Sequence, residues 1–267
     1  MRHIDIAQLL GEIQQTVEGS AALQTVRKAH ITFVKRDDHG RAKYYADRRY
    51  EKWKALKEQL VDRLGPKCWY SEARLIGAPL TIDHFRPQNS YWFLIFDSSN
   101  YRVACPFVNS GETNPLYGCA GGKGNEFPLL DERVRATGKK ATKAERPLLL
   151  DPCDKDDCER LTFEADGRPV VSPAFEGNEL AEKKVEISKI VLNLDHPAFN
   201  TEREQLYFDV KGKVDEYNDT ATSQRTRDRL AEDLRAMIGK TAAFSSAARQ
   251  YLKMFRDSDW VELLLQE

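Results

Sequence analysis

The central part of the chain, residues 67–130, interrupts an otherwise helical pattern and therefore restricts the fold to a mixed one. It combines short apolar runs and many turn residues with Trp69, Trp92, His84 and three of the five cysteines of the 267-residue chain. The segments on both sides instead place apolar residues at helical spacing. The sequence predicts an α+β fold, in which a small β-containing centre lies between two helical parts.

Local patterns predict the elements on both sides of this centre. Apolar residues over 6–17 are spaced as in a helix, with Gly19 as its predicted end, and a second helical pattern covers 53–64. Residues 161–173 predict a small hairpin around an Asp-Gly turn. From residue 178 onward the chain is predicted to be mostly helical.

Charge is unevenly distributed, although the net charge is only −1. Residues 1–67 carry 14 basic and 9 acidic side chains, whereas the remainder carries 27 and 33. This balance excludes a uniformly basic surface for nucleic acid but allows a local basic face. A second basic stretch, at 133–146, contains glycine and is predicted to be a mobile loop.

Basic density is highest at residues 36–57, where basic and aromatic side chains alternate. They are Arg41, Lys43, Arg48, Arg49, Lys52, Lys54 and Lys57, with Tyr44, Tyr45, Tyr50 and Trp53. This mixture suits a phosphate backbone with stacked bases. The alternative is a solvated helix face with Trp53 packed inward, which this stretch on its own favours. Both interpretations stay open.

The sequence also indicates a cellular compartment. No apolar run approaches the roughly 20 residues that a membrane-spanning helix needs, and the first residues lack the layout of a signal peptide. Five cysteines, an odd number, argue against a disulfide scaffold and for reducing conditions. We therefore expect a cytoplasmic protein that makes no contact with a membrane.

Residues able to carry chemistry follow one another in order within the central part. Asp83 and His84 are adjacent at a predicted strand end, and Asn100 follows the histidine by 16 residues. Asn109 then closes a Cys-x3-Asn segment, and a Lys-Gly pair begins at Lys123. This ordered set resembles the HNH (ββα-metal) nuclease motif.

Three later segments narrow the resemblance. They are Glu-Arg-Pro-Leu-Leu-Leu-Asp-Pro at 145–152, Leu-Thr-Phe at 161–163 with Asp-Gly at 166–167, and Ile-Val-Leu-Asn-Leu at 190–194 with Arg203. Together with the central motif they resemble the HNH endonucleases of the Septu anti-phage defence system (PtuB-like), over about residues 66–210. The resemblance implies a phosphodiester hydrolase that acts on DNA in a complex with an SMC-like ATPase (PtuA-like).

The resemblance also implies a role for each motif residue. His84 is the general base that activates water, and Asn100 holds the loop and orients this histidine. Asp83 and Asn109 supply oxygen ligands to Mg²⁺ or Mn²⁺, which prefer such donors, so Asn109 is counted with the catalytic residues too. The candidates for contact with the substrate phosphate are Arg86 and Lys123.

The cysteines depart from the pattern of many HNH proteins of this type, in which two Cys-x-x-Cys pairs bind a structural Zn²⁺. Ser71 stands where a second cysteine is expected after Cys68, and Val108 stands at the matching place after Cys105. Cys119, in an insert at 111–122, is a candidate third sulfur. Because Ser and Val are poor zinc ligands, we do not expect a structural zinc.

The expected organisation has three parts. They are a helical N-terminal region with the basic–aromatic stretch (1–65), an HNH nuclease core (66–150) and a mostly helical C-terminal region (151–267). Two further functions stay open beside a DNA endonuclease: a non-catalytic nucleic-acid or protein-binding module on an HNH fold, and an RNA-directed nuclease. The basic–aromatic stretch does not discriminate DNA from RNA.

Overall fold

The computed structural model describes residues 1–47, 49–111 and 113–266, without the side chains of residues 49, 50, 119 and 120. Two predictions fall partly outside this description. The side chains of Arg48, Arg49 and Tyr50, from the basic–aromatic stretch, are not described, and neither is the side chain of Cys119, the candidate third sulfur.

The regular elements of the described chain are α-helices, short 3-10 helices and three small antiparallel strand pairs. The helices are α1 (Ile6–Gln14), α2 (Val17–Val34), α3 (Asp38–Ala46), α4 (Arg49–Leu64), α5 (Pro106–Asn109), α6 (Lys155–Glu159), α7 (Glu179–Val191), α8 (Pro197–Asn218), α9 (Gln224–Ile238), α10 (Ser245–Lys253) and α11 (Asp259–Gln266). The strand pairs are β1 (Thr81–His84) with β2 (Tyr101–Ala104), β3 (Thr113–Asn114) with β4 (Cys119–Ala120), and β5 (Leu161–Phe163) with β6 (Pro169–Val171). This mixed architecture agrees with the expected α+β class.

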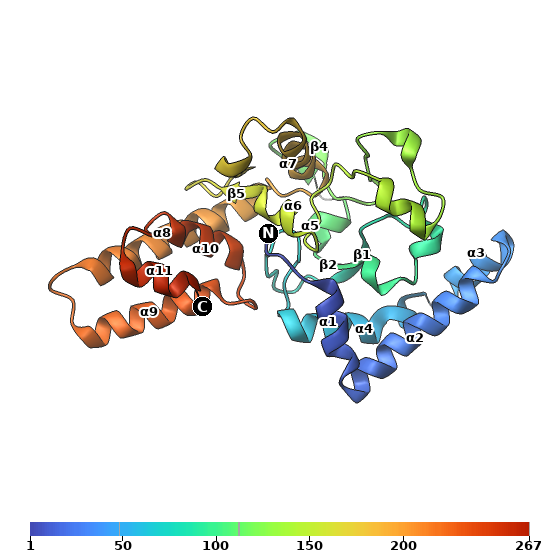
Figure 1. The fold of residues 1–267 in the computed structure, drawn as a ribbon, viewed down its shortest axis with the longest axis horizontal. Coiled ribbons are helices and arrows are strands. Elements are labelled where there is room, and N and C mark those ends of the chain that lie inside the picture. The colour runs from blue at the N-terminus through green and yellow to red at the C-terminus, as the bar shows by residue number, and fades with distance from the viewer. Residues whose placement is uncertain (48, 112, 267) are drawn as a thin grey trace.

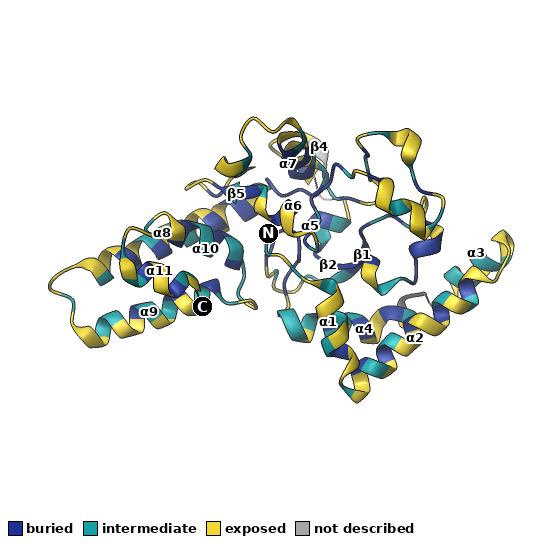
Figure 2. Ribbon diagram, in the orientation of Figure 1, coloured by how far each residue is buried: buried dark blue, intermediate teal, exposed yellow. Residues whose placement is uncertain are grey.

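The strand pairs lie between two helical parts. Figure 1 shows α1–α4 on one side of the molecule and α8–α11 on the other, with β1, β2 and α5 between them. Two apolar cores follow this layout: one joins α1, α2 and α4 to one face of the β1–β2 pair, and the other joins the central part to the C-terminal helices. Buried segments accordingly gather at the centre of Figure 2.

The predicted helix end at Gly19 is wrong, because this glycine lies inside α2. The first helix already ends at Gln14, and Thr16 then caps α2 by accepting a hydrogen bond from the backbone N–H of Gly19. A Cβ at position 19 would lie 2.1 Å from the carbonyl oxygen of Ile13. Glycine is needed here because two helices approach closely, and it does not act as a stop.

The second N-terminal pattern is confirmed. Helix α4 ends at Leu64, and Gly65 follows with a φ of 81°, a left-handed conformation that glycine adopts without strain. Trp53 of this helix is buried, so the packed-inward interpretation of this residue is correct. Every residue of the neighbouring helix α3, by contrast, is at least partly exposed.

The predictions of a hairpin and of a mostly helical C-terminal region are also confirmed. Strands β5 and β6 pair around Asp166 and Gly167, which has a φ of 79°. After residue 178 the chain forms α7–α11. Within the described residues, no helix is long and apolar enough to cross a membrane.

Candidate active site

The β1–β2 pair places two neighbouring motif residues on different faces. Its register sets His84 opposite Tyr101 and Asp83 opposite Arg102. Since successive side chains of a strand point to opposite faces, Asp83 and His84 point apart although they are adjacent in the chain. His84 faces the N-terminal helices, where its ring centroid lies 5.4 Å from that of Trp53.

His84 is buried, and both of its ring nitrogens have partners. Nε2 lies 2.7 Å from the carbonyl oxygen of Ile95. A carbonyl only accepts, so Nε2 carries the proton and Nδ1 is an acceptor. The side-chain amide of Gln88 donates to Nδ1 at 2.7 Å, and its oxygen accepts a hydrogen bond from the hydroxyl of Tyr45. Gln88 therefore caps the basic atom of His84.

The charge state of His84 follows from this burial. Removal from water lowers the pKa of His84 to about 4, although the hydrogen bond to Ile95 acts in the opposite direction. The imidazole is neutral near pH 7, with one orientation and one tautomer.

Both oxygens of the Asp83 carboxylate are engaged. Oδ1 accepts a hydrogen bond from Nζ of Lys123 at 2.9 Å, and Oδ2 accepts one from the hydroxyl of Tyr70 at 2.6 Å. The Lys123 side chain is fully buried, and its ammonium also donates to the carbonyl oxygen of His84 at 2.6 Å. The structure thus pairs the predicted metal ligand with a predicted phosphate contact, inside the protein.

Asn100 binds the backbone of the loop that follows the histidine. Its Oδ1 accepts a hydrogen bond from the N–H of Arg86 at 2.9 Å, and its Nδ2 donates to the carbonyl oxygen of Arg86 at 3.0 Å. The Arg86 guanidinium turns away to Glu145, whose Oε2 lies 2.7 Å from its Nε. Asn100 therefore fixes the chain two residues after His84, and Arg86 ties this loop to the second basic stretch.

Asn109 lies at the end of α5, on the Asp83 side of the strand pair. Its Nδ2 donates to Oγ1 of Thr81 at 3.0 Å, and Thr81 precedes Asp83 by two residues on the same face of β1. Its amide oxygen accepts no hydrogen bond from a described residue. Asn109 thus keeps an oxygen for another partner.

The two predicted metal ligands fit a hard cation in kind. Within the part of the chain that the structure describes, no three His, Cys, Asp or Glu side chains converge on a metal position. Asp83 and Asn109 do offer oxygens from one side of the β1–β2 pair, which suits Mg²⁺ or Mn²⁺ held largely by water and substrate. A cation at Asp83 would have to compete with the ammonium of Lys123, which occupies Oδ1 in this structure.

The fold brings the two incomplete zinc pairs together. Oγ of Ser71 lies 4.0 Å from Sγ of Cys105, and Cys68, Ser71, Cys105 and Val108 are all buried. A hydrogen bond between the two cysteines, together with burial, raises the pKa of the Cys105 thiol. Two sulfurs, a hydroxyl and an isopropyl group therefore stand at the sequence positions of the four cysteines of such a zinc site.

We expect the purified protein to contain no stoichiometric zinc, because a tetrahedral structural site needs four good ligands. The double variant Ser71→Cys/Val108→Cys completes the set and is expected to bind about one Zn²⁺ per chain. Elemental analysis of both proteins, prepared in parallel, measures this. One equivalent of zinc in the unmodified protein contradicts the expectation.

Several residues of the site lie outside the ordered motif of the sequence. Gln88, Tyr45, Tyr70 and Ile95 contact motif residues through loops or neighbouring helices. Tyr45 is 43 residues from Gln88 in the chain, and local spacing does not report contacts at such separations. Tyr45 belongs to the basic–aromatic stretch, and this stretch is the sequence feature that points to it.

The geometry defines a small mixed α/β unit, in which an antiparallel strand pair with a buried histidine is followed directly by a short helix. No protein-family model matches the chain. The chain is similar to the Septu protein PtuB of Bacillus mycoides (strain KBAB4), at 26% identity over 205 residues. The match covers 71% of this chain and 64% of that protein, so the chain spans just under two thirds of this curated relative. The predicted resemblance to PtuB-like Septu proteins is confirmed, at the level of a distant relative.

Proposed function

We propose that the protein is a metal-dependent HNH endonuclease that hydrolyses DNA phosphodiester bonds, as the effector of an anti-phage defence complex. The similarity to PtuB supports the defence role. The observation that carries the nuclease proposal is the state of His84: a neutral imidazole, oriented by the Ile95 carbonyl, at the end of the first strand of a strand–strand–helix unit. Such an imidazole has one nitrogen able to accept a proton.

In the proposed reaction, His84 accepts a proton from the attacking water at Nδ1 after the Gln88 amide has moved away. The hydrogen bond from Nε2 to Ile95 keeps the ring in place and stabilises the imidazolium that forms. A divalent cation, when bound, neutralises charge on the phosphate and the leaving oxygen. Asp83 and Asn109 would hold it, with Lys123 displaced. Because Asp83 and His84 point to opposite faces of the strand pair, the proposed reaction also requires the two side chains to turn toward one phosphate.

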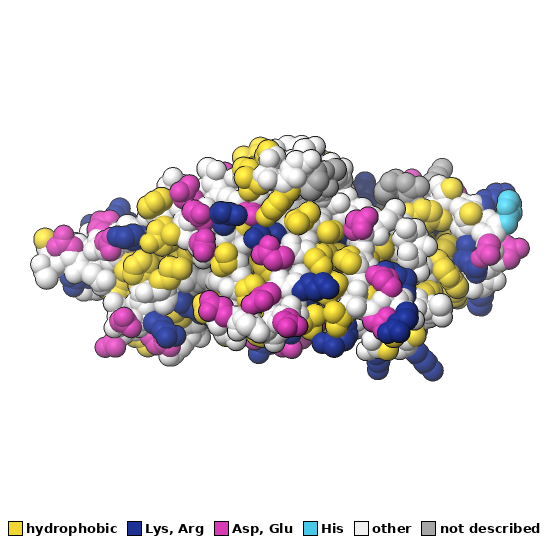
Figure 3. All heavy atoms as spheres, turned by 90° about the horizontal axis from the view of Figure 1, so that it is seen from above, with side chains coloured by type: hydrophobic (Ala, Val, Ile, Leu, Met, Phe, Trp, Pro, Cys, Tyr) yellow, Lys and Arg dark blue, Asp and Glu magenta, His cyan; other side chains and the backbone are white. Residues whose placement is uncertain are grey.

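The surface supports a role for a partner in DNA binding. On the face drawn in Figure 3, Lys and Arg side chains are interspersed with Asp and Glu, and neither sign forms a continuous patch. This face therefore offers no clustered positive charge, on which non-specific binding to DNA depends. We propose that an SMC-like ATPase supplies the remaining affinity in the cytoplasm. A neighbouring reading frame with a Walker A motif would support this pairing.

Removal of divalent cations is expected to abolish DNA cleavage, and Mg²⁺ or Mn²⁺ should restore it. Plasmid nicking by the protein, alone and together with the ATPase of the neighbouring frame, measures this before and after chelation. Asp83→Ala should remain inactive after the metal is returned. Asp215→Ala, which removes an exposed carboxylate paired with Lys211, should behave as the unmodified protein does. Full cleavage in excess chelator contradicts the metal requirement.

The Asp83–Lys123 pair and the capped His84 favour one alternative, a non-catalytic binding module on an HNH fold. A module of this kind retains nucleic-acid binding but cleaves neither DNA nor RNA under any metal or partner condition. Labelled RNA, incubated in parallel with DNA of the same sequence, also separates a DNA-directed from an RNA-directed nuclease.

A further inference from the structure

We propose that a cavity beside His84 binds one unpaired nucleobase of a nucleic-acid strand. It lies between α2, α3 and the loop that joins β1 to β2, and has a volume of about 420 Å³. Pockets for small molecules typically measure roughly 300–1,000 Å³. This inference rests on the proposed function, because the cavity would hold one unstacked base of the nucleic acid that the proposed nuclease cleaves.

Aromatic and cationic groups supply the stacking surfaces of this cavity. Phe33, Tyr45 and Trp92 line it; Trp92 is 39% exposed and Tyr45 is partly exposed, whereas Phe33 is buried. The guanidinium of Arg41 lies 4.1 Å from the centroid of the Trp92 ring and is held by Asp38. Unpaired bases stack on aromatic rings and on guanidinium planes. The fold thus joins the basic–aromatic stretch to a tryptophan of the central part.

Amide side chains supply hydrogen-bonding groups on the same cavity wall. Gln88, Asn89 and Asn125 line the cavity together with the aromatic rings. An amide presents both a donor and an acceptor, which matches the edge of a nucleobase. Aromatic faces combined with amides fit a flat polar ring better than they fit an aliphatic side chain.

Gln88 connects the cavity to the proposed general base. Its amide nitrogen donates to Nδ1 of His84, and its amide oxygen accepts from Tyr45. A base that takes these amide hydrogen bonds therefore releases Nδ1. Occupation of the cavity by substrate is thereby coupled to exposure of the proton acceptor.

The test measures binding apart from cleavage. Fluorescence anisotropy measures the binding of a labelled 12-nucleotide single strand and of its duplex, with chelator present to prevent cleavage. The free deoxynucleoside monophosphates are tested as competitors of the labelled strand. The single strand should bind more tightly than the duplex, and Trp92→Ala should weaken its binding about tenfold, or about 1.4 kcal/mol. Trp92→Phe should restore most of this loss, because a stacking ring remains.

Three controls make the result specific. Phe208→Ala removes an aromatic ring that is 56% exposed on α8 and should leave binding unchanged. His84→Ala should bind the single strand at least as tightly, because the Gln88 amide is then free, so a failed nuclease assignment leaves the binding result intact. The proposal is overturned if Trp92→Ala and the unmodified protein bind the single strand with equal affinity. It is also overturned if Trp92→Ala loses affinity for the mononucleotides alone.

Discussion

His84→Ala is expected to lower the rate of DNA cleavage by about 10²–10⁴-fold, the usual contribution of a general base. Nδ1 of His84 is the one nitrogen of the ring that can accept a proton, because Nε2 is committed to the carbonyl of Ile95. Single-turnover cleavage of labelled DNA, with Mg²⁺ and the proposed ATPase partner present, measures the loss. Thermal unfolding of the variant shows whether the buried position tolerates the change.

Gln88→Ala is the matched variant for this measurement. It removes the amide that caps Nδ1 but leaves the imidazole and its contact with Ile95 in place. At a saturating concentration of DNA we expect cleavage at least as fast as in the unmodified protein, since Nδ1 of His84 no longer has to be uncapped. Equal rates for His84→Ala and the unmodified protein rule out His84 as the base, whereas equal loss in both variants assigns Gln88 a direct role.

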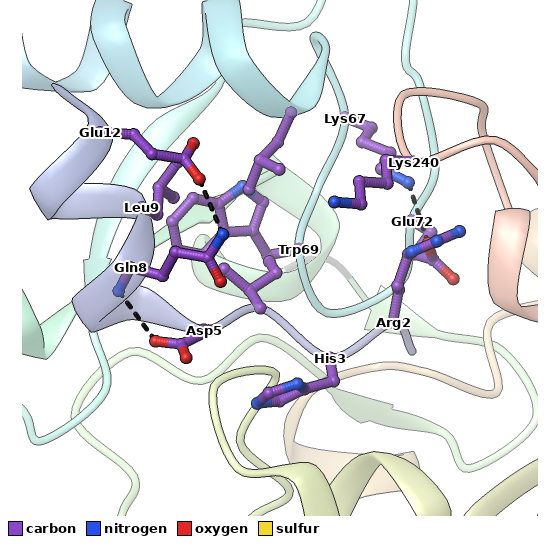
Figure 4. Close-up of a pocket in the computed structure, with 12 residues that line it drawn as sticks. Arg2, His3, Asp5, Gln8, Leu9, Glu12, Lys67, Trp69, Glu72 and Lys240 are labelled. Atoms are coloured by element: carbon purple, nitrogen blue, oxygen red, sulfur yellow. Dashed lines mark hydrogen bonds and ion pairs between the residues drawn. The ribbon is translucent and has the colours of Figure 1, made fainter.

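Glu72→Gln is expected to destabilise the fold by about 3–5 kcal/mol, the cost of breaking a buried ion pair at one partner. Glu72 is buried at the boundary between the central part and the C-terminal helices, beside Lys67 in Figure 4. Oε1 accepts hydrogen bonds from Nζ of Lys67 at 2.9 Å and from Oγ of Ser245 at 2.8 Å. The substitution leaves the buried ammonium of Lys67 without a counter-charge. Urea unfolding at pH 7 measures the difference.

The pH dependence of stability gives an independent check on the same residue. Burial alone would raise the pKa of Glu72, but the positive charges of the Met1 amino group and Lys67 lower it to about 2 from 4.5. A lowered folded-state pKa stabilises the protein above the unfolded value, and this stabilisation is lost as the pH falls from about 4.5 toward 2. Glu72→Gln should lack this part of the acid-induced loss.

Glu159→Gln provides the control for the stability measurement. Glu159 forms an exposed pair with Lys155 at 3.8 Å, and such pairs contribute about 0–1 kcal/mol. If Glu72→Gln also lowers the free energy of unfolding by only about 0–1 kcal/mol, the Glu72–Lys67 pair does not hold the central part to α10.

Local patterns predicted those elements whose formation depends on neighbouring residues. The hairpin at 161–173 follows from an Asp-Gly turn between short apolar strands, and α4 ends where Gly65 permits a left-handed conformation. Gly19 shows the limit of this method. Its role depends on the approach of Ile13 from the preceding helix, so a glycine that reads locally as a stop lies within a helix.

The sequence by itself determined the kinds of residue at the site and their order: an acid and a histidine at a strand end, two asparagines, and two halves of a cysteine cluster. Tertiary structure alone decided what these side chains face. Asp83 pairs with Lys123, 40 residues away in the chain, while His84 turns to the opposite side and is capped by Gln88. Alternation along a strand points neighbouring side chains to opposite faces. Each buried polar group then needs a hydrogen-bond partner, and the packing of distant segments decides which partner lies within reach.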